Sequence, residues 1–359
     1  MLIIGCDYHP GFQQIAMADT EGGDFVERRV ESSETEQFYG ELQGREVEVG
    51  VETSGNMLAF ERVMAKYGFR LRIGDAAKIR ASDPRKTNND RFSAQRILKL
   101  LLEGHFPDLP IPSLEVRDLR QLLVHRHKLV RMRAQVKNQL QHIALNQGLR
   151  LRRKLWTESG RQQIEALELG RWTKMRRDSL LQRLDSFDKE VSKLDALVLQ
   201  EALKNPQAVL LMTHPGVGPV ISLAFVLTIG DAQRFANGKK VAGYLGLAPC
   251  ENSSGERRRV GSITKQGSTF MRYLLVEGAQ TAIRREMGWA RAYRRLAKKK
   301  QRSGEAKVMV ARKLAVRLYW MLRTNTKYPE IVGHARQPES SRGGKTDRLS
   351  GHLASRAGA

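Results

Sequence analysis

The strongest constraint on the fold is a long helical repeat in the middle of the chain. Apolar residues recur at helical spacing over residues 119–143 and again over 172–203. Ser113 is a suitable N-cap for the first helix. We predict a long antiparallel helical arm with coiled-coil character. Its apolar stripe serves as an intramolecular hairpin, as a seam between two copies of the chain, or as both.

The segment before this arm, residues 1–106, alternates strand and helix patterns instead. Short apolar runs with turn-forming residues between them predict strands, and longer stretches with helical periodicity predict helices. This order predicts an α/β domain with a mixed sheet flanked by helices. The predicted strands are 2–7, 13–19, 25–30, 46–51 and 71–73, and the predicted helices are 56–67 and 92–103.

The segment after the arm is a third unit. Residues 206–328 are rich in glycine turns and helical patterns, with helices expected at 271–283 and 308–322. We take Trp320 in the second of these as a core residue. Residues 329–359 are polar and rich in Gly, Ser and Arg, which is typical of a disordered tail. The expected organisation is therefore 1–106, an arm at 107–205, 206–328, and the tail.

The charge of the chain restricts its partners. The 359 residues carry a formal net charge of +24, and the pI is near 10.4. This points to a polyanion, either nucleic acid or an anionic membrane surface. No apolar stretch reaches the length of a membrane span, and the first residues lack the basic segment of a signal peptide. Two cysteines favour neither a disulfide framework nor a zinc site, so we expect a cytoplasmic protein. Composition alone fits a DNA enzyme and a basic RNA-packing protein equally well.

The arm is a candidate nucleic-acid interface. Its face opposite the apolar stripe is basic, and we predict that this face contacts phosphates. The residues concerned are Arg126, Lys128, Arg131, Arg133 and Lys137.

Three carboxylates suggest a metal centre in the first domain. Asp7 and Glu52 each stand at the end of a predicted strand, and Asp90 begins a predicted helix. If the two strands are neighbours, both carboxylates project from one edge of the sheet. Such clusters bind Mg²⁺, and two ions together assist phosphodiester cleavage. Taken singly, each acid is more often a helix cap or a solvated strand end.

The surrounding strings resemble a known family. Ile4-Gly5-Cys6-Asp7, Val51-Glu52-Thr53-Ser54-Gly55 and Asp90-Arg91-Phe92-Ser93-Ala94 are similar to the N-terminal domain of the DEDD transposases of bacterial insertion sequences. The resemblance implies a RuvC-like, ribonuclease H-type fold with Asp7, Glu52 and Asp90 as metal ligands.

One position departs from the family pattern. The family's last two acids come as Asp-x-x-Asp-Ala, and this chain has Ser93 at the second of them. A serine hydroxyl can bind Mg²⁺ but adds no charge, so we expect a weak or inactive copy. Asp83, Asn88 and Asn89 are alternative substitutes for the missing ligand.

A glycine turn opens the third unit. His214-Pro215-Gly216-Val217-Gly218-Pro219 resembles the hairpin of a helix-hairpin-helix motif, in which backbone N–H groups face a DNA phosphate. A simple tight turn explains Gly216 and Gly218 equally well.

A serine beside several basic residues follows. Asn252-Ser253-Ser254-Gly255 precedes Arg257 and Arg258, and Lys265 stands in a Lys-x-Gly element. On physical grounds alone, a surface loop of turn formers is the favoured interpretation. However, the order of Gly-Leu-x-Pro, Ser-Gly and Lys-x-Gly elements resembles the C-terminal domain of the same transposase family. That resemblance implies that Ser254, or failing that Ser253, attacks DNA and forms a phosphoserine link.

The resemblance also implies a function and partners. The family's transposases recombine DNA, guided by a structured non-coding bridge RNA, and they assemble composite sites from several subunits. We therefore expect a nucleoid-associated DNA recombinase that binds Mg²⁺, element and target DNA and a bridge RNA, and that forms a homodimer or homotetramer. Two rival hypotheses remain. One is a metal-dependent, structure-specific nuclease in which Ser254 is structural, and the other is a degenerate transposase that only binds.

Overall fold

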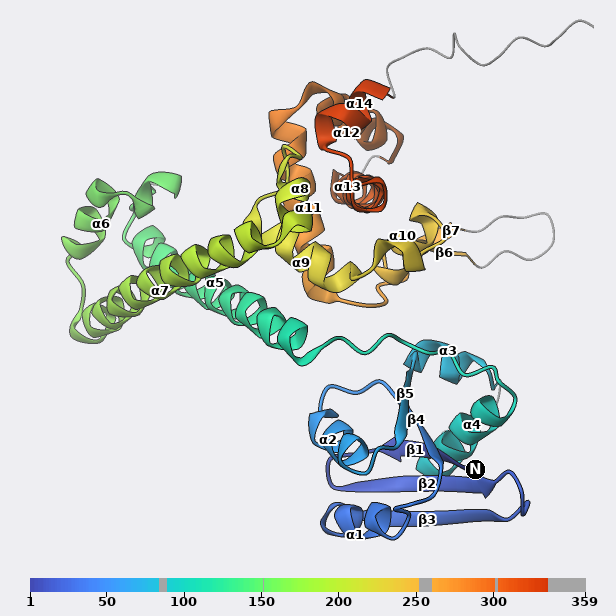
Figure 1. Ribbon diagram of the computed structural model, residues 1–359. Helices are drawn as coiled ribbons and strands as arrows, with labels where there is room; N and C mark the ends of the chain where they lie inside the picture. Colours follow the sequence, from blue (N-terminus) through green and yellow to red (C-terminus); the bar gives the residue numbers. More distant parts are fainter. Residues whose placement is uncertain (84–88, 151, 252–259, 301–302, 335–359) are drawn as a thin grey trace, which may run out of the picture. The chain divides into compact units, whose positions relative to one another are not determined.

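The computed structural model describes residues 1–83, 89–150, 152–251, 260–300 and 303–334. Figure 1 shows the elements along the chain. Two compact units are present, Met1–Ser113 and the chain from Leu114 onward. The first is built on a mixed sheet and the second is helical, as the sequence predicts. No helix in the described ranges is both long enough and apolar enough to cross a bilayer.

The first unit contains a five-stranded sheet in the order β3-β2-β1-β4-β5. β1 pairs with β2 and β2 with β3 in antiparallel register, whereas β1-β4 and β4-β5 are parallel pairs. The central strands are rich in Val and Ile and lie buried, as expected for a sheet covered on both faces. The strands are β1 (Leu2–Tyr8), β2 (Phe12–Asp19), β3 (Phe25–Glu31), β4 (Val47–Glu52) and β5 (Arg70–Gly74).

Helices cover both faces of this sheet. On one face, α1 (Thr35–Gly40) and α2 (Leu58–Lys66) enclose a core that includes Tyr39 and Phe60. On the other face, α3 (Ala76–Ala81) and α4 (Asp90–Leu102) enclose a second core around Ile97. A short 3-10 helix, η1 (Ser32–Glu34), precedes α1. The result is a three-layer α/β/α unit.

Gly5 sets how closely α4 approaches β1. A Cβ atom at this position would lie 2.3 Å from the carbonyl oxygen of Ala94 and 2.4 Å from the amide nitrogen of Leu98. Real structures do not tolerate such contacts with backbone atoms, so the absence of a side chain permits the helix to lie directly on the strand. This approach brings the first turn of α4 next to the end of β1.

The second unit begins with the arm. α5 (Leu114–Asn146) and α7 (Arg171–Lys204) pack along each other. Ion pairs join Arg126 to Asp195 at 2.8 Å and Arg133 to Asp188 at 2.9 Å, so the partner number falls as the α5 number rises. The helices are therefore antiparallel, which is the intramolecular hairpin among the alternatives left open by the sequence. The link between them contains η2 (Arg152–Trp156) and α6 (Glu158–Glu165).

The rest of the second unit is a helical bundle around α13. Leu314, Leu318 and Tyr319 of this helix are fully buried. The bundle also carries one two-stranded antiparallel hairpin, β6-β7. Its elements are α8 (Pro206–Met212), α9 (Pro219–Ile229), η3 (Ala232–Arg234), α10 (Gly238–Tyr244), β6 (Pro249–Glu251), β7 (Val260–Ile263), α11 (Thr269–Arg285), α12 (Met287–Lys300), α13 (Ser303–Thr324) and α14 (Tyr328–His334).

One expectation about an individual side chain was wrong. Trp320 was predicted to be a core residue, but its side chain is exposed. Its neighbour in the chain, Tyr319, is fully buried instead. Where several apolar residues are close together in a helix, periodicity alone does not tell which of them faces the core.

The predicted tail also needs correction at its start. Residues 329–334 belong to α14 and do not form an unstructured segment. Tyr328 begins this helix, and its side chain is buried against the bundle. The remaining residues of the predicted tail, 335–359, lie outside the described residues.

Candidate active site

The first two acids are neighbours because their strands are neighbours. β1 and β4 run parallel, with Cys6 opposite Val51. Asp7 and Glu52 directly follow these two partners, so both stand at the carboxyl ends of adjacent strands. The prediction that the two carboxylates share one edge of the sheet is confirmed.

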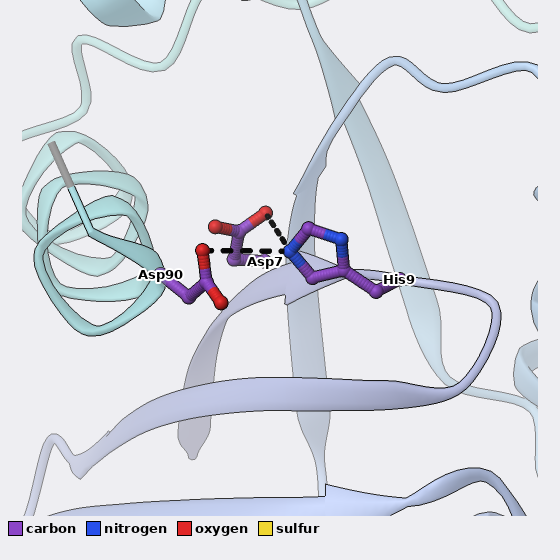
Figure 2. A group of neighbouring side chains, drawn as sticks. All are labelled: Asp7, His9 and Asp90. Atoms are coloured by element: carbon purple, nitrogen blue, oxygen red, sulfur yellow. Dashed lines mark ion pairs between the residues drawn. The ribbon is translucent and has the colours of Figure 1, made fainter.

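Asp90 reaches the same edge from α4, as Figure 2 shows. A histidine lies between it and Asp7. The Nε2 atom of His9 is 3.7 Å from an Asp7 carboxylate oxygen and 3.6 Å from an Asp90 carboxylate oxygen. One ligand atom from each of the three residues lies within 4.8 Å of the others. That spacing suits a single metal ion.

The electrostatics of the acids reflect their partial burial. Burial raises the pKa of Asp7. His9 lowers it and the charge of Asp90 raises it. Burial also raises the pKa of Glu52, whereas the Arg80 guanidinium, 3.2 Å away, opposes this rise. Like charges held together out of water are costly, so the cluster favours a cation that neutralises it.

Ser93 lies at the family's fourth acidic position, one helical turn after Asp90. Its hydroxyl makes a hydrogen bond with the Asp7 carboxyl, which lowers the pKa of that group. The alternative substitutes are engaged elsewhere. The Asn89 side chain caps α4 by accepting from the Phe92 amide at 2.8 Å, and Asp83 pairs with Arg96 at 3.5 Å. Asn88 lies outside the described residues.

His9 is a residue that sequence reasoning missed. It lies two residues after Asp7 in the chain, beyond the end of the strand that the apolar pattern predicts. The only signal was its presence at i+2 from a candidate ligand. Its Nε2 atom is buried and has no hydrogen-bond partner. A ring nitrogen without a hydrogen-bond partner, lying between two carboxylates, is suited to bind a metal ion.

Comparison with known proteins places these residues in context. A family model for the DEDD transposases of IS110 elements matches residues 4–148, which contain Asp7, Glu52 and Asp90. A second model, described as transposase of the IS116/IS110/IS902 family, matches residues 208–295. Together the two models match more than half of the chain.

The chain belongs to the IS110/IS116 family of insertion-sequence transposases.

Individual relatives agree with this placement. A probable family 20 transposase of Pseudomonas aeruginosa is 23% identical over 295 residues, which are 78% of this chain and 84% of the relative. The transposase for insertion sequence element IS1111A of Coxiella burnetii is 25% identical over 204 residues, 56% of each chain. A pilin gene-inverting protein of Moraxella bovis is 29% identical over 133 residues, 36% of this chain and 40% of that protein.

The predicted nucleophile of this transposase, Ser254, lies outside the described residues, as do Ser253, Arg257 and Arg258. The strands β6 and β7, which precede and follow this segment in the chain, pair with each other, with Pro249 opposite Ile263. The hairpin therefore brings residue 249 and residue 263 together on either side of the segment that contains the candidate serine.

The turn at Gly246, before β6, packs against the turn at Gly267, after β7. Gly246 has a φ of 67°, and a Cβ there would lie 2.1 Å from the carbonyl oxygen of Gln266. Gly267 has a φ of 65°, and its Cβ would lie 2.4 Å from the carbonyl oxygen of Tyr244. Lys265 also has a positive φ, 57°, which is uncommon for a residue with a side chain. The Gly-Leu-x-Pro and Lys-x-Gly elements of the transposase thus meet backbone to backbone.

Arg272 on α11 forms hydrogen bonds with both turns. Its guanidinium donates to the carbonyl oxygens of Gln266 and Gly267, and to that of Leu245 at 3.5 Å. The sequence contained no signal for this role, because the acceptors are backbone atoms from two separate turns.

The glycine turn before α9 has a packing role. A Cβ on Gly216 would lie 2.5 Å from the carbonyl oxygen of Gly278 on α11, so Gly216 permits close packing inside the bundle. Gly218 has open space around it and stands at the N-cap of α9.

The basic residues of the arm fall into two groups. Arg126 and Arg133 form ion pairs across the α5-α7 hairpin, and the Lys137 ammonium lies 5.1 Å from the centre of the Trp156 ring. Lys128 and Arg131 are exposed. The two groups therefore differ in how freely they can meet a phosphate.

Proposed function

We propose that this transposase is the DNA recombinase of an insertion sequence and that it cuts and rejoins DNA through a phosphoserine intermediate. The observation that carries the proposal is the grouping of Asp7, His9 and Asp90, with Glu52 at the end of the strand next to that of Asp7. The order β3-β2-β1-β4-β5, with β2 antiparallel, supports the RuvC-like fold expected for such a cluster.

The carboxylates are suited to hold Mg²⁺ beside a scissile phosphate. The ion, when bound, neutralises phosphate charge and stabilises the departing oxygen. Asp7 and Asp90 have ligand atoms close enough for one ion, and Glu52 would approach from the end of the adjacent strand β4. Arg80, now paired with Glu52, is placed to exchange that carboxylate for a phosphate oxygen.

Ser254 supplies the nucleophile in this proposal. Its Oγ loses its proton and attacks the phosphorus, forming a phosphoserine ester while the DNA 3′ oxygen leaves and takes up a proton. A 3′-hydroxyl from a partner strand later attacks the same phosphorus and releases the serine. Each step exchanges one phosphate ester for another, so no ATP is needed. Arg257, Arg258 and Lys265 would bind the non-bridging oxygens.

The partners follow from the charge and from the relatives. A net charge of +24 suits a protein that binds long polyanions. We infer that element DNA, target DNA and a structured bridge RNA share this surface, with Lys128 and Arg131 of the arm and Gly218 at α9 among the contacts. The gene-inverting relative supports recombination in which strands are rejoined. A homodimer or homotetramer would let one copy's serine meet another copy's metal centre.

The decisive experiment traps the intermediate. DNA ends of the element, with Mg²⁺ and co-purified RNA, should give a protein–DNA species that survives a denaturing gel. Ser254→Ala should abolish that species while DNA binding persists, because the hydroxyl is not an anchor. Loss of the adduct in Ser253→Ala, with retention in Ser254→Ala, would move the nucleophile by one residue.

The rival hypotheses give different results in the same assay. A structure-specific nuclease would cleave without any covalent adduct, and Ser254→Ala would cleave normally. A degenerate transposase would bind DNA and RNA but form neither product. Sequencing the RNA that co-purifies with the chain tests the guide independently of cleavage.

A further inference from the structure

The metal centre of the proposed function lacks one ligand of the family pattern. Ser93 replaces the fourth acid, and its hydroxyl is engaged with the Asp7 carboxyl. The centre therefore carries one negative charge less than the family's arrangement. This raises the question of which other group completes the centre.

His9 is placed where it can supply the missing ligand. Its Nε2 atom lies 3.7 Å from an Asp7 oxygen and 3.6 Å from an Asp90 oxygen, and it is buried without a hydrogen-bond partner. Figure 2 shows the imidazole directed between the two carboxylates. Within the part of the chain that the structure describes, this is the group of His, Cys, Asp and Glu side chains whose ligand atoms come together at metal-binding distance.

The imidazole is held in this orientation by the β1-β2 turn. The His9 amide donates to the carbonyl oxygen of Phe12 at 2.9 Å. The His9 and Phe12 rings are stacked, with centroids 4.7 Å apart and 24° between their planes. The guanidinium of Arg29 covers the Phe12 ring at 3.8 Å. Ligands fixed by their surroundings bind metals more tightly, because less ordering is needed on binding.

We propose that His9 Nε2 is a ligand of the metal held by Asp7 and Asp90, and that this centre prefers Mn²⁺ to Mg²⁺. The inference rests on the metal centre of the proposed function. Mg²⁺ demands oxygen ligands in a near-octahedral arrangement. Imidazole nitrogen suits transition metals, whose affinities for such sites exceed that of Mg²⁺. A nitrogen in place of the fourth carboxylate oxygen therefore shifts selectivity toward a transition metal.

The test uses the full-length chain loaded with Mn²⁺ alone. Electron spin-echo spectroscopy should show nitrogen modulation on the bound Mn²⁺, and this pattern should change when the protein is made with ¹⁵N-labelled histidine. This readout needs neither a variant nor activity. In titrations, His9→Gln should remove the modulation and weaken Mn²⁺ binding about tenfold or more. Mg²⁺ binding, measured by competition, should change less than about twofold.

Two variants make the result specific. His125→Gln, an exposed arm residue, should leave the modulation and both affinities unchanged. Asp7→Asn should weaken Mn²⁺ and Mg²⁺ alike, since the carboxylate serves either ion.

The possible failures are distinguishable. If Mn²⁺ binds and Asp7→Asn abolishes binding, but wild type shows no nitrogen modulation, the role of His9 is refuted and the metal centre stands. If His9→Gln strengthens Mn²⁺ binding, the imidazole acts as a cation paired with the carboxylates, which also refutes the inference. If wild type does not bind Mn²⁺, or if binding is indifferent to Asp7→Asn, the metal centre of the proposed function fails as well.

Discussion

The closest contact behind the candidate active site is the one between Gly5 and α4, and Gly5→Ala tests it. The new Cβ would lie 2.3 Å from a backbone oxygen and 2.4 Å from a backbone nitrogen, where about 3.0 Å is the lower limit. Because both atoms belong to the helix backbone, no side-chain rotation relieves the clash. The helix must move by at least about 0.7 Å relative to β1.

This displacement acts directly on the site. Asp90 and Ser93 are in the first turn of α4, whereas Asp7 follows Gly5 on β1 by two residues. A displacement approaching 1 Å at a catalytic constellation can reduce the rate on the order of 100-fold. Overpacking also destabilises the first unit by about 1–3 kcal/mol. We therefore expect Gly5→Ala to fold but to lose most metal affinity and DNA cleavage.

The assay compares Gly5→Ala with Gly11→Ala. Gly11 has no atoms within 4 Å of an added Cβ and lies in the same hairpin, so it controls for the loss of a glycine. Divalent-metal affinity and cleavage of DNA ends are measured for both, with circular dichroism to confirm folding. Wild-type affinity and cleavage in Gly5→Ala would refute the argument that this contact positions α4.

Three further predictions follow from the described contacts. Burial lowers the pKa of His214 to about 3, below an unfolded value of about 6.5, so stability falls as pH drops below about 6.5. The loss is about 2 kcal/mol near pH 5, and chemical denaturation of His214→Gln should show a flatter pH profile there. Arg131→Ala should reduce the salt slope of nucleic-acid binding by about one, whereas ion-paired Arg126→Ala should mainly lower the melting temperature; equal slopes for both variants would contradict this. Ser93→Asp should lower the Mg²⁺ concentration needed for activity, because it adds a charged oxygen ligand, and an unchanged Mg²⁺ titration would show that position 93 is not the missing ligand.

Much of the fold could be predicted because it depends on local patterns. Short apolar runs identified the strands, the predicted N-cap Ser113 directly precedes α5, and helical spacing identified α7 to within one residue at each end. Asp7, Glu52 and Asp90 were recognisable since strand ends and helix starts are themselves local features. Their meeting at one edge needed one further condition, that β1 and β4 pair in parallel, and the sheet has that order.

The arm shows where periodicity stops being informative. The stripe of apolar residues predicted burial, but it did not identify the partner helix. The ion pairs of Arg126 and Arg133 with α7 resolve this, since charged residues beside an apolar seam pair with whatever helix covers it. A basic face that looks uniform in the sequence therefore contains paired and exposed members in the folded arm.

The family, the element types and the three acids were predictable from the sequence, because each depends on residues close together in the chain. Three contacts were visible only in the folded chain: His9 lies between Asp7 and Asp90, Ser93 is hydrogen-bonded to Asp7, and Gly5 permits α4 to pack directly on β1. These contacts bring β1 and the turn that follows it against α4, which begins more than 80 residues later in the chain. Their geometry follows from how closely backbones can pack, which hydrophobic spacing does not encode.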